Sequence, residues 1–429
     1  MTFPVLVTFL LNMLTKTLQV ELHRFLKLLT GQTPAVTVSK QAFSQARQKL
    51  SEQTFCRLSE RLVEEFYTEN TYTTWQGYRL IGIDGSTAQL PESDAIRQAF
   101  GCSVNQCGHG MPLGRISVAY DVENGLSIDA RLAPYGRGER DLALAHLTAI
   151  TAYDQRTSGR RGHTGDLFLF DMGYPALDFI ALFVLAGKDV VIRTADSRIK
   201  EVHAAIHAAS DDQILQIPLQ TAWRRRSPKL LAQYPDLDPA WTLTLRVLTI
   251  ALDDGRPEYL LTTLLDQEAF PTPVFHGLYG KRWGSETHYD GLKNILEIEN
   301  FTGTSVLSVR QDFYATVLTS NIYGLIQWEL QEEIEAENRS AARKYQYQLN
   351  KNVSIGLLKD TLVTLLMEQG DLQEFYEEMK CQMKRQIVPI RPGRRRPRTR
   401  KTRRKYPMNK RRALYPPWNG PWHRGYCSG

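Results

Sequence analysis

Four polar side chains recur at steps of three, four and seven residues along one stretch of the chain: Tyr279, Arg282, Glu286 and Lys293. On an α-helix this spacing places them within a sector of roughly 60°. A phenol, a guanidinium, a carboxylate and an ammonium do not form the apolar face of a core helix. The pattern predicts either a metal-binding carboxylate between phosphate-binding groups or a solvated helix face with ion pairs.

Two aspartates upstream favour the metal site. Asp84 closes the apolar run 79–84 and is followed by glycine, and Asp171 closes the run 166–171 with Gly173 two residues on. A single Asp-Gly is more often a turn. Carboxylates at the ends of neighbouring strands, joined by one from a packed helix, can instead converge on Mg²⁺ or Mn²⁺. Two such ions would activate a water or a 3′-hydroxyl for in-line displacement at phosphorus.

The elements that must position these acids alternate in type. The sequence predicts strands over 79–86, 115–122 and 126–132, with a hairpin signal at 123–125, and then a helix over 139–153. A strand at 166–171, a helix at 176–186 and a strand at 189–193 follow. Three antiparallel strands followed by alternating helices and strands predict a mixed α/β sheet with helices on both faces.

The flanking segments differ in character. Residues 1–78 are expected to be helical, and a short helix pair there could contact DNA through Lys40, Arg47 and Lys49. Residues 198–270 indicate a small β insertion, with strand patterns at 242–250 and 259–264. Helix is predicted over 279–293, 308–335 and 354–379.

These motifs together resemble the DDE transposases of bacterial insertion sequences, in the group with a Y-(2)-R-(3)-E-(6)-K signature. Tyr279, Arg282, Glu286 and Lys293 match that spacing without a gap. Asp84 in Ile-Asp-Gly-Ser matches the family's first acid, and Asp171 in Asp-Met-Gly-Tyr its second. Residues 39–50 are similar to the family's N-terminal region. The resemblance covers roughly residues 1–335 and implies a ribonuclease H-like catalytic domain.

The resemblance also implies a mechanism. One or, more typically, two Mg²⁺ or Mn²⁺ ions held by Asp84, Asp171 and Glu286 would support hydrolysis at a transposon 3′ end. The freed 3′-hydroxyl would then attack either the opposite strand, forming a hairpin, or target DNA. Asp290 is a rival to Glu286, four residues on and about 40° away on the same helix face, but it does not fit the signature spacing.

Further DNA contacts follow from the same resemblance. Tyr279, Arg282 and Lys293 would grip phosphates near the transferred strand. Some relatives with a β insertion stack a tryptophan on a flipped base. Here that role falls to Trp223, beside the basic run Arg224, Arg225 and Arg226, or to Trp241; core packing is the competing interpretation for either tryptophan. The implied partners are double-stranded DNA, as terminal inverted repeats and as target, and a second subunit in a homodimer on DNA.

The predicted organisation has six parts. They are an N-terminal helical, possibly DNA-binding region (1–77), the first part of the catalytic domain (78–197), the β-rich insertion (198–272), the second part with the glutamate helix (273–340), a C-terminal helical region (341–380) and a basic tail (381–429).

Charge is distributed unevenly along the chain. Residues 380–429 hold 17 of the 53 Lys and Arg residues and no Asp or Glu, so the preceding residues carry 36 basic against 46 acidic side chains. Such a proline-interleaved basic tail is expected to be disordered and to bind nucleic acid without sequence preference; a merely solubilising tail is the alternative.

Cysteines and hydrophobic segments indicate the compartment. Five scattered cysteines favour a reducing compartment over a disulfide framework, and Cys102, Cys107 and His109 make only a weak zinc pattern. The apolar start of the chain lacks a basic region and a cleavage site, and no later run reaches about 18 apolar residues. We expect a cytosolic protein. A nuclease without strand transfer and a non-catalytic DNA-binding relic are the alternatives to a transposase.

Overall fold

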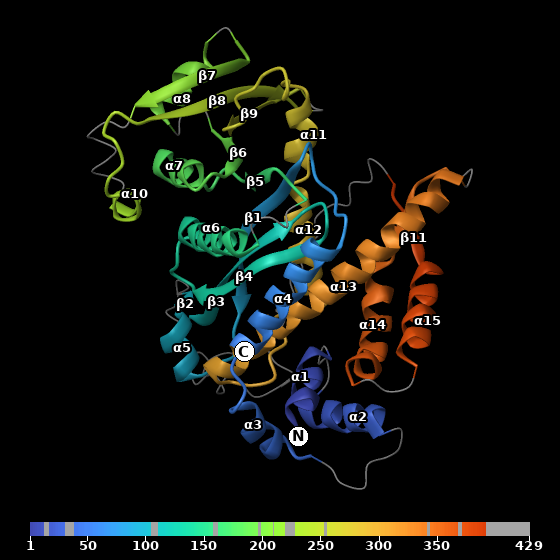
Figure 1. The fold of residues 1–429 in the computed structure, drawn as a ribbon. Coiled ribbons are helices and arrows are strands. Elements are labelled where there is room, and N and C mark those ends of the chain that lie inside the picture. Colours follow the sequence, from blue (N-terminus) through green and yellow to red (C-terminus); the bar gives the residue numbers. More distant parts are fainter. Residues whose placement is uncertain are drawn as a thin grey trace, which may run out of the picture.

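The computed structural model describes residues 1–12, 17–30, 38–103, 110–157, 162–195, 199–208, 210–218, 228–252, 255–340, 344–367 and 371–391. One large mixed sheet runs through the molecule, and helices cover both of its faces (Figure 1). This confirms the mixed α/β architecture predicted from the order of the elements.

The sheet combines antiparallel and parallel pairings. Its strands are β1 (Tyr78–Gln89), β2 (Cys102–Ser103), β3 (Met111–Asp121), β4 (Leu126–Pro134), β5 (Gly165–Phe170), β6 (Asp189–Thr194), β7 (Asp212–Pro218), β8 (Thr242–Ala251) and β9 (Pro257–Thr262). Their order is β2-β3-β1-β5-β6-β9-β8-β7, and β4 also pairs with β3. The β1–β5 and β5–β6 pairs are parallel, and the other pairs are antiparallel.

Side chains of the central strands alternate between two apolar cores. Ile81 and Ile83 of β1 face one core, while Leu80, the residue before Ile81, faces the other. The first core includes side chains of α6 (Glu139–Arg156) and α7 (Leu177–Leu185), and the second includes side chains of α11 (Val274–Gly280). Because both faces are covered, the strands are almost continuously apolar in sequence.

The β-rich segment extends the main sheet instead of forming a sheet of its own. Strand β9 pairs with β6, with Val191 opposite Thr262, and β8 and β7 follow outward. The predicted strand patterns correspond to β8 and β9. Two short helices accompany them, α8 (Lys200–Ile206) and α10 (Pro228–Gln233).

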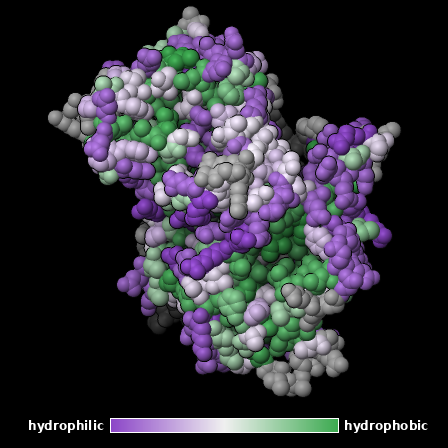
Figure 2. Space-filling model, viewed as in Figure 1, coloured by the Kyte–Doolittle hydropathy of each residue, from purple (hydrophilic) through white to green (hydrophobic). Residues whose placement is uncertain are grey.

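Helices from both ends of the chain pack around α13 (Val306–Ser340), the long helix predicted at 308–335. They are α1 (Phe3–Leu11), α2 (Leu18–Thr30), α3 (Lys40–Arg47), α4 (Gln53–Glu69), α14 (Lys351–Leu366) and α15 (Leu372–Lys384). Helix α5 (Asp94–Phe100), which follows β1, also contacts α13. A small β10–β11 ladder (Tyr347–Leu349 and Ile387–Pro389) closes the described chain. Figure 2 shows hydrophobic residues gathered in the lower half of this face and hydrophilic residues over α15.

The prediction that Arg47 faces solvent beside Lys40 and Lys49 is wrong. Arg47 is buried, and its guanidinium donates to Gln311 Oε1 at 2.8 Å and to Asp312 Oδ1 at 2.8 Å. A buried carboxylate on α13 therefore competes successfully with water for this cation, which ties α3 to α13. Lys40 and Lys49 are exposed, as expected.

Among the described residues, no helix combines the length and the apolar character needed to cross a membrane.

Candidate active site

The two aspartates predicted as metal ligands lie where β1 and β5 part. The parallel ladder has Gly82 opposite Leu169 as its last pair, and Asp84 and Asp171 each follow two residues later. Strand β5 ends just before Asp171, as predicted, but β1 continues to Gln89 because β3 remains its partner. The prediction that Asp84 closes its strand is therefore wrong. The ladder between β1 and β5 nevertheless ends at Gly82 and Leu169, and this brings both aspartates to one edge.

Helix α12 (Trp283–Asn294) carries Glu286 and packs along β1. Gly82 makes this possible, because a methyl group there would lie 2.1 Å from Ser285 Oγ. One turn further along, the Tyr289 hydroxyl donates to the carbonyl oxygen of Asp84 at 2.8 Å. Glu286 lies between these two contacts and its side chain is one-third exposed (33%), so its carboxylate is accessible beside Asp84.

Lys293 fastens the end of the same helix to the strand. Its Nζ donates to Ser86 Oγ at 2.6 Å and to the carbonyl oxygen of Thr87 at 2.8 Å. Burial lowers the pKa of this ammonium group. Lys293 thus holds α12 against β1, and its implied phosphate contact stays a prediction.

A tight turn interrupts the helix predicted over 279–293. Helix α11 ends at Gly280 and α12 begins at Trp283, and the N–H of Arg282 donates to the carbonyl of Tyr279, three residues back. Bonds of this span belong to a 3₁₀ turn. Gly280 has the low helix propensity that favours such a break. The prediction of one continuous helix is wrong, although the four signature residues still lie in sequence along one wall of the site.

The first two signature residues are turned inward. The buried Tyr279 hydroxyl donates to the carbonyl oxygen of Phe170, the last residue of β5, at 3.3 Å. Arg282 is 4% exposed and its Nη2 donates to Glu286 Oε1 at 2.9 Å. Tyr279 thus positions the strand end before Asp171, and Arg282 orients the glutamate. Their implied phosphate contacts stay predictions.

Negative charge is concentrated at this edge. Burial raises the pKa of Asp84, the charges of Glu286 and Asp171 raise it further, and the Gly85 N–H and Arg282 oppose the rise. In addition, Asp171 Oδ1 is buried and has no hydrogen-bond partner among the described residues. A hard carboxylate oxygen without a partner, among like charges, is what a divalent cation would bind. These residues fit Mg²⁺ or Mn²⁺.

A second acidic group lies near the start of the β1–β5 ladder. Ligand atoms of Asp154, His163 and Asp166 all lie within 4.8 Å of one another, a spacing that Asp84, Asp171 and Glu286 do not share in this structure. Two buried cations already neutralise this group: Arg79 Nε lies 2.7 Å from Asp166 Oδ1, and Lys188 bonds to both aspartates. We therefore assign it to a structural ion-pair network.

The predicted aromatic and cysteine sites are only partly covered by the structure. Trp223, Arg224, Arg225 and Arg226 lie outside the described residues, as do Cys107, His109 and the tail beyond residue 391. Trp241 is half-buried and packs against the core near α7. Sequence reasoning missed Trp283, which is 55% exposed beside Arg282; its place inside the signature stretch was the available signal.

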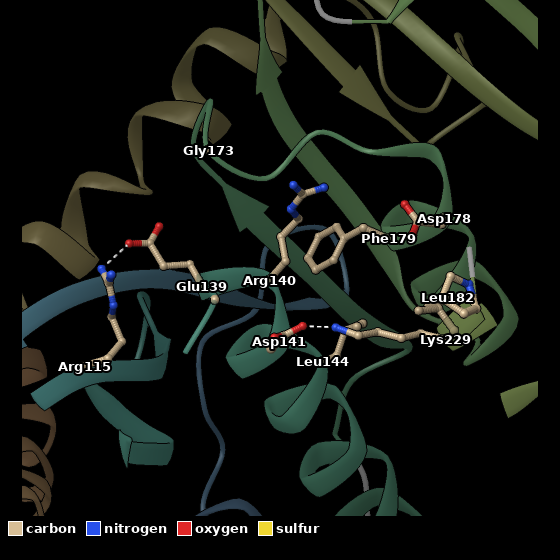
Figure 3. A pocket seen from close by; sticks show the side chains of 12 residues that line it. Arg115, Glu139, Arg140, Asp141, Leu144, Gly173, Asp178, Phe179, Leu182 and Lys229 are labelled. Atoms are coloured by element: carbon tan, nitrogen blue, oxygen red, sulfur yellow. Dashed lines mark hydrogen bonds and ion pairs between the residues drawn. The ribbon is translucent and has the colours of Figure 1, made fainter. Parts of the chain in front are cut away.

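Sequence reasoning also missed Glu139, the first residue of α6. The available signal was its place as an acid in the first turn of the helix predicted after the third strand. Its Oε1 accepts a hydrogen bond from Arg115 Nη1 at 2.8 Å. Both side chains line a cavity of about 570 Å³ that reaches Gly173 at one end and Lys229 at the other. Figure 3 shows the Glu139 carboxylate on the Gly173 side of this cavity.

Comparison with known proteins agrees with the sequence motifs. The chain is 24% identical over 393 residues to the transposase InsG of insertion sequence element IS4 from Escherichia coli (strain K12), covering 89% of this chain and 80% of that protein. A solved piggyBac transposase synaptic complex with hairpin DNA overlaps with a TM-score of 0.39 at 10% identity, covering 81% of this chain and 65% of that one, just under two thirds. A TM-score this low does not establish a shared fold. The model of the transposase DDE domain matches residues 75–322, more than half of the chain, and the protein therefore belongs to the DDE transposase family.

Proposed function

We propose that this transposase cleaves DNA at the inverted-repeat ends of an insertion sequence and transfers the freed strand, with Asp84, Asp171 and Glu286 as the ligands of two Mg²⁺ or Mn²⁺ ions. The main support is the common edge at which β1 and β5 part, where α12 is pinned beside Asp84. The order β4-β3-β1-β5-β6, three antiparallel strands and then two parallel ones, supports a ribonuclease H-like core. The six-part division of the chain remains part of this proposal.

The residues around the acids have distinct tasks in this scheme. Bound divalent ions would supply charge for activating water and for stabilising the leaving oxygen. Arg282 holds Glu286 by a 2.9 Å hydrogen bond, and Lys293 and Tyr289 keep α12 in register with β1. Positioning of this kind matters because a misplacement of about 1 Å can cost a 100-fold loss of rate.

Two chemical steps follow. In the first, a water oxygen attacks phosphorus at the end of the element and the 3′ oxygen leaves with a proton, so a free 3′-hydroxyl results. In the second, the oxygen of this hydroxyl loses its proton and attacks the phosphorus of another phosphodiester, either across the duplex or in target DNA. The 3′ oxygen of the attacked strand leaves with a proton. Both steps are in-line displacements at phosphorus and use the same carboxylates.

The partners in this proposal are double-stranded DNA, as terminal repeats and as target, and a second copy of the chain, because two element ends must be cut. Such DNA lies in the bacterial cytoplasm, where we place the protein. The basic tail would add contacts to phosphates that do not depend on sequence.

The test supplies Mg²⁺ or Mn²⁺ and DNA carrying the element's ends to the wild type and to Asp84→Asn, Asp171→Asn and Glu286→Gln. We expect each of these substitutions to abolish cleavage. Asp290→Asn is the matched control: Asp290 is exposed on the same helix and accepts a hydrogen bond from Asn294, so cleavage should be retained. Equal cleavage by all variants would refute the ligand set. Cleavage at arbitrary sequences without joined products would instead support a nuclease that lacks strand transfer.

A further inference from the structure

A fourth carboxylate reaches the edge that holds Asp84 and Asp171. A methyl group on Gly85, the residue after Asp84, would lie 3.0 Å from Glu139 Cδ and 3.1 Å from its Oε1. A methyl group on Gly173, two residues after Asp171, would lie 3.7 Å from Glu139 Oε2. The carboxylate of Glu139 therefore sits between the two backbone segments that carry the aspartates. Glycine at both positions leaves the space between them open.

An unpartnered hydroxyl is directed at the same place. Tyr174 is 1% exposed, and its hydroxyl has no hydrogen-bond partner among the described residues. Burial raises its pKa, and the charges of Glu139, Asp84 and Asp171 raise it further, in that order. A phenol buried without a partner is costly. Tyr174 follows Gly173, the glycine that faces Glu139, so this unpartnered hydroxyl belongs to the same segment and indicates a site that gains a ligand.

The pairing of charges points to a cation. Arg282 is paired with Glu286 and Arg115 with Glu139, whereas Asp84 and Asp171 have no ion-pair partner among the described residues. Arg115 is the partner of Glu139 at 2.8 Å, but its Nε is buried and has no partner among the described residues. The pair is only partly buried, with side-chain exposures of 22% and 40%, so each partner can exchange the other for a new ligand.

We propose that Glu139 is a fourth carboxylate of the metal site, which binds the divalent ion directly or through its water, and that Arg115 occupies this carboxylate while the metal is absent. The inference rests on the proposed function, because it assumes that Asp84 and Asp171 are ligands. A bound metal would take the place of Arg115 on this carboxylate, and the guanidinium, which lines the 570 Å³ cavity, could then bind a DNA phosphate.

The experiment measures Mn²⁺ binding to the full-length protein without DNA, by electron paramagnetic resonance of the free ion. Glu139→Gln keeps the shape of the side chain and removes its charge, and we expect Mn²⁺ to bind about 10-fold more weakly. Arg115→Gln removes the competing cation, and we expect tighter binding than in the wild type. These two opposite changes would not arise from an ion pair that serves only stability.

Asp141→Asn is the matched control. Asp141 belongs to the same first turn of α6 and lines the same cavity. It is paired with Lys229, on the side of the cavity away from Arg115 (Figure 3). Its substitution should leave Mn²⁺ affinity unchanged. Thermal unfolding, measured by circular dichroism, verifies that each variant is folded.

The outcomes separate the two proposals. If Asp84→Asn and Asp171→Asn lose Mn²⁺ while Glu139→Gln binds it as the wild type does, the role of Glu139 is overturned and the three-acid site stands. If Asp84→Asn binds Mn²⁺ normally, the proposed function itself fails. If Arg115→Gln weakens binding as much as Glu139→Gln does, the exchange between Arg115 and the metal is overturned.

Discussion

The packing of α12 on β1 through a single glycine is open to a direct test, Gly82→Ala. The added methyl group would lie 2.1 Å from Ser285 Oγ and 3.2 Å from Val122 Cγ1. Rotation of the serine hydroxyl removes the first overlap, but Val122 must still give way. Overpacking of this kind costs about 1–3 kcal/mol, and for a chain of 429 residues that corresponds to a fall in melting temperature of about 1–3 °C.

A double substitution isolates the cause. Ser285 Oγ is buried and has no hydrogen-bond partner among the described residues, so Ser285→Ala alone should be nearly neutral. In the double variant Gly82→Ala/Ser285→Ala, the nearest serine-derived atom is Cβ at 3.4 Å, an ordinary contact. We expect at least half of the lost melting temperature to return. Gly356→Ala, with open space around a helical glycine, controls for the effect of glycine on the unfolded chain.

The same substitution should affect catalysis beyond its effect on stability. Asp84 lies two residues after Gly82, and Glu286 follows Ser285, so pushing the helix away separates the two carboxylates. A displacement of about half an ångström should reduce metal-dependent cleavage about 10-fold, measured at a temperature at which the variant remains folded. A Gly82→Ala protein that melts like the wild type and gains nothing from Ser285→Ala would refute this account of how Glu286 is positioned.

Two further predictions concern other parts of the chain. Arg47→Met leaves the Asp312 carboxylate without its cation and should lower the free energy of unfolding, measured in urea, by about 3–5 kcal/mol. Lys49 is exposed, so Lys49→Met should change it by less than about 0.5 kcal/mol. Equal effects would contradict the assignment of Arg47 to the core. Burial, with the charges of Glu60 and Asp129, raises the pKa of Cys56 from 9.0 to about 12. At pH 8 the thiolate fraction of Cys56 should therefore be about 1,000-fold smaller than that of an ordinary cysteine. This fraction should rise about tenfold with each pH unit up to the pKa. Mass-spectrometric mapping of iodoacetamide labelling should therefore find the exposed Cys381 alkylated long before Cys56, and similar rates would contradict this.

The parts of the site that could be predicted from sequence are those set by local periodicity. Apolar runs ending at Asp84 and Asp171 indicate strands whose carboxyl ends meet, and the spacing from Arg282 to Lys293 indicates one face of a helix. Neither inference needs knowledge of a distant partner. The structure brings the aspartates to one edge for this reason, even though β1 itself continues beyond Asp84.

The parts that could not be predicted depend on partners far away in sequence. Residues beyond Asp84 look like a turn locally, but antiparallel pairing with β3 holds them extended. Arg47 and Lys49 carry the same charge two residues apart. Partners more than 250 residues away, among them Gln311 and Asp312, make Arg47 a core residue. Glu139 is an ordinary first-turn acid until the glycines after both aspartates are seen to face it.

The continuous sheet determines how a mechanical load passes through this protein. Strand β5, which ends at Phe170 just before Asp171, is bonded to β6, and β6 is bonded to β9 of the β-rich segment. Strands joined by a ladder shift as one body, because many backbone bonds must stretch together before any strand slides. A displacement of β7, β8 and β9 would thus be passed through backbone hydrogen bonds to the end of β5, next to Asp171. Since the β1–β5 ladder has already ended there, such a displacement would change the distance between Asp171 and Asp84 first.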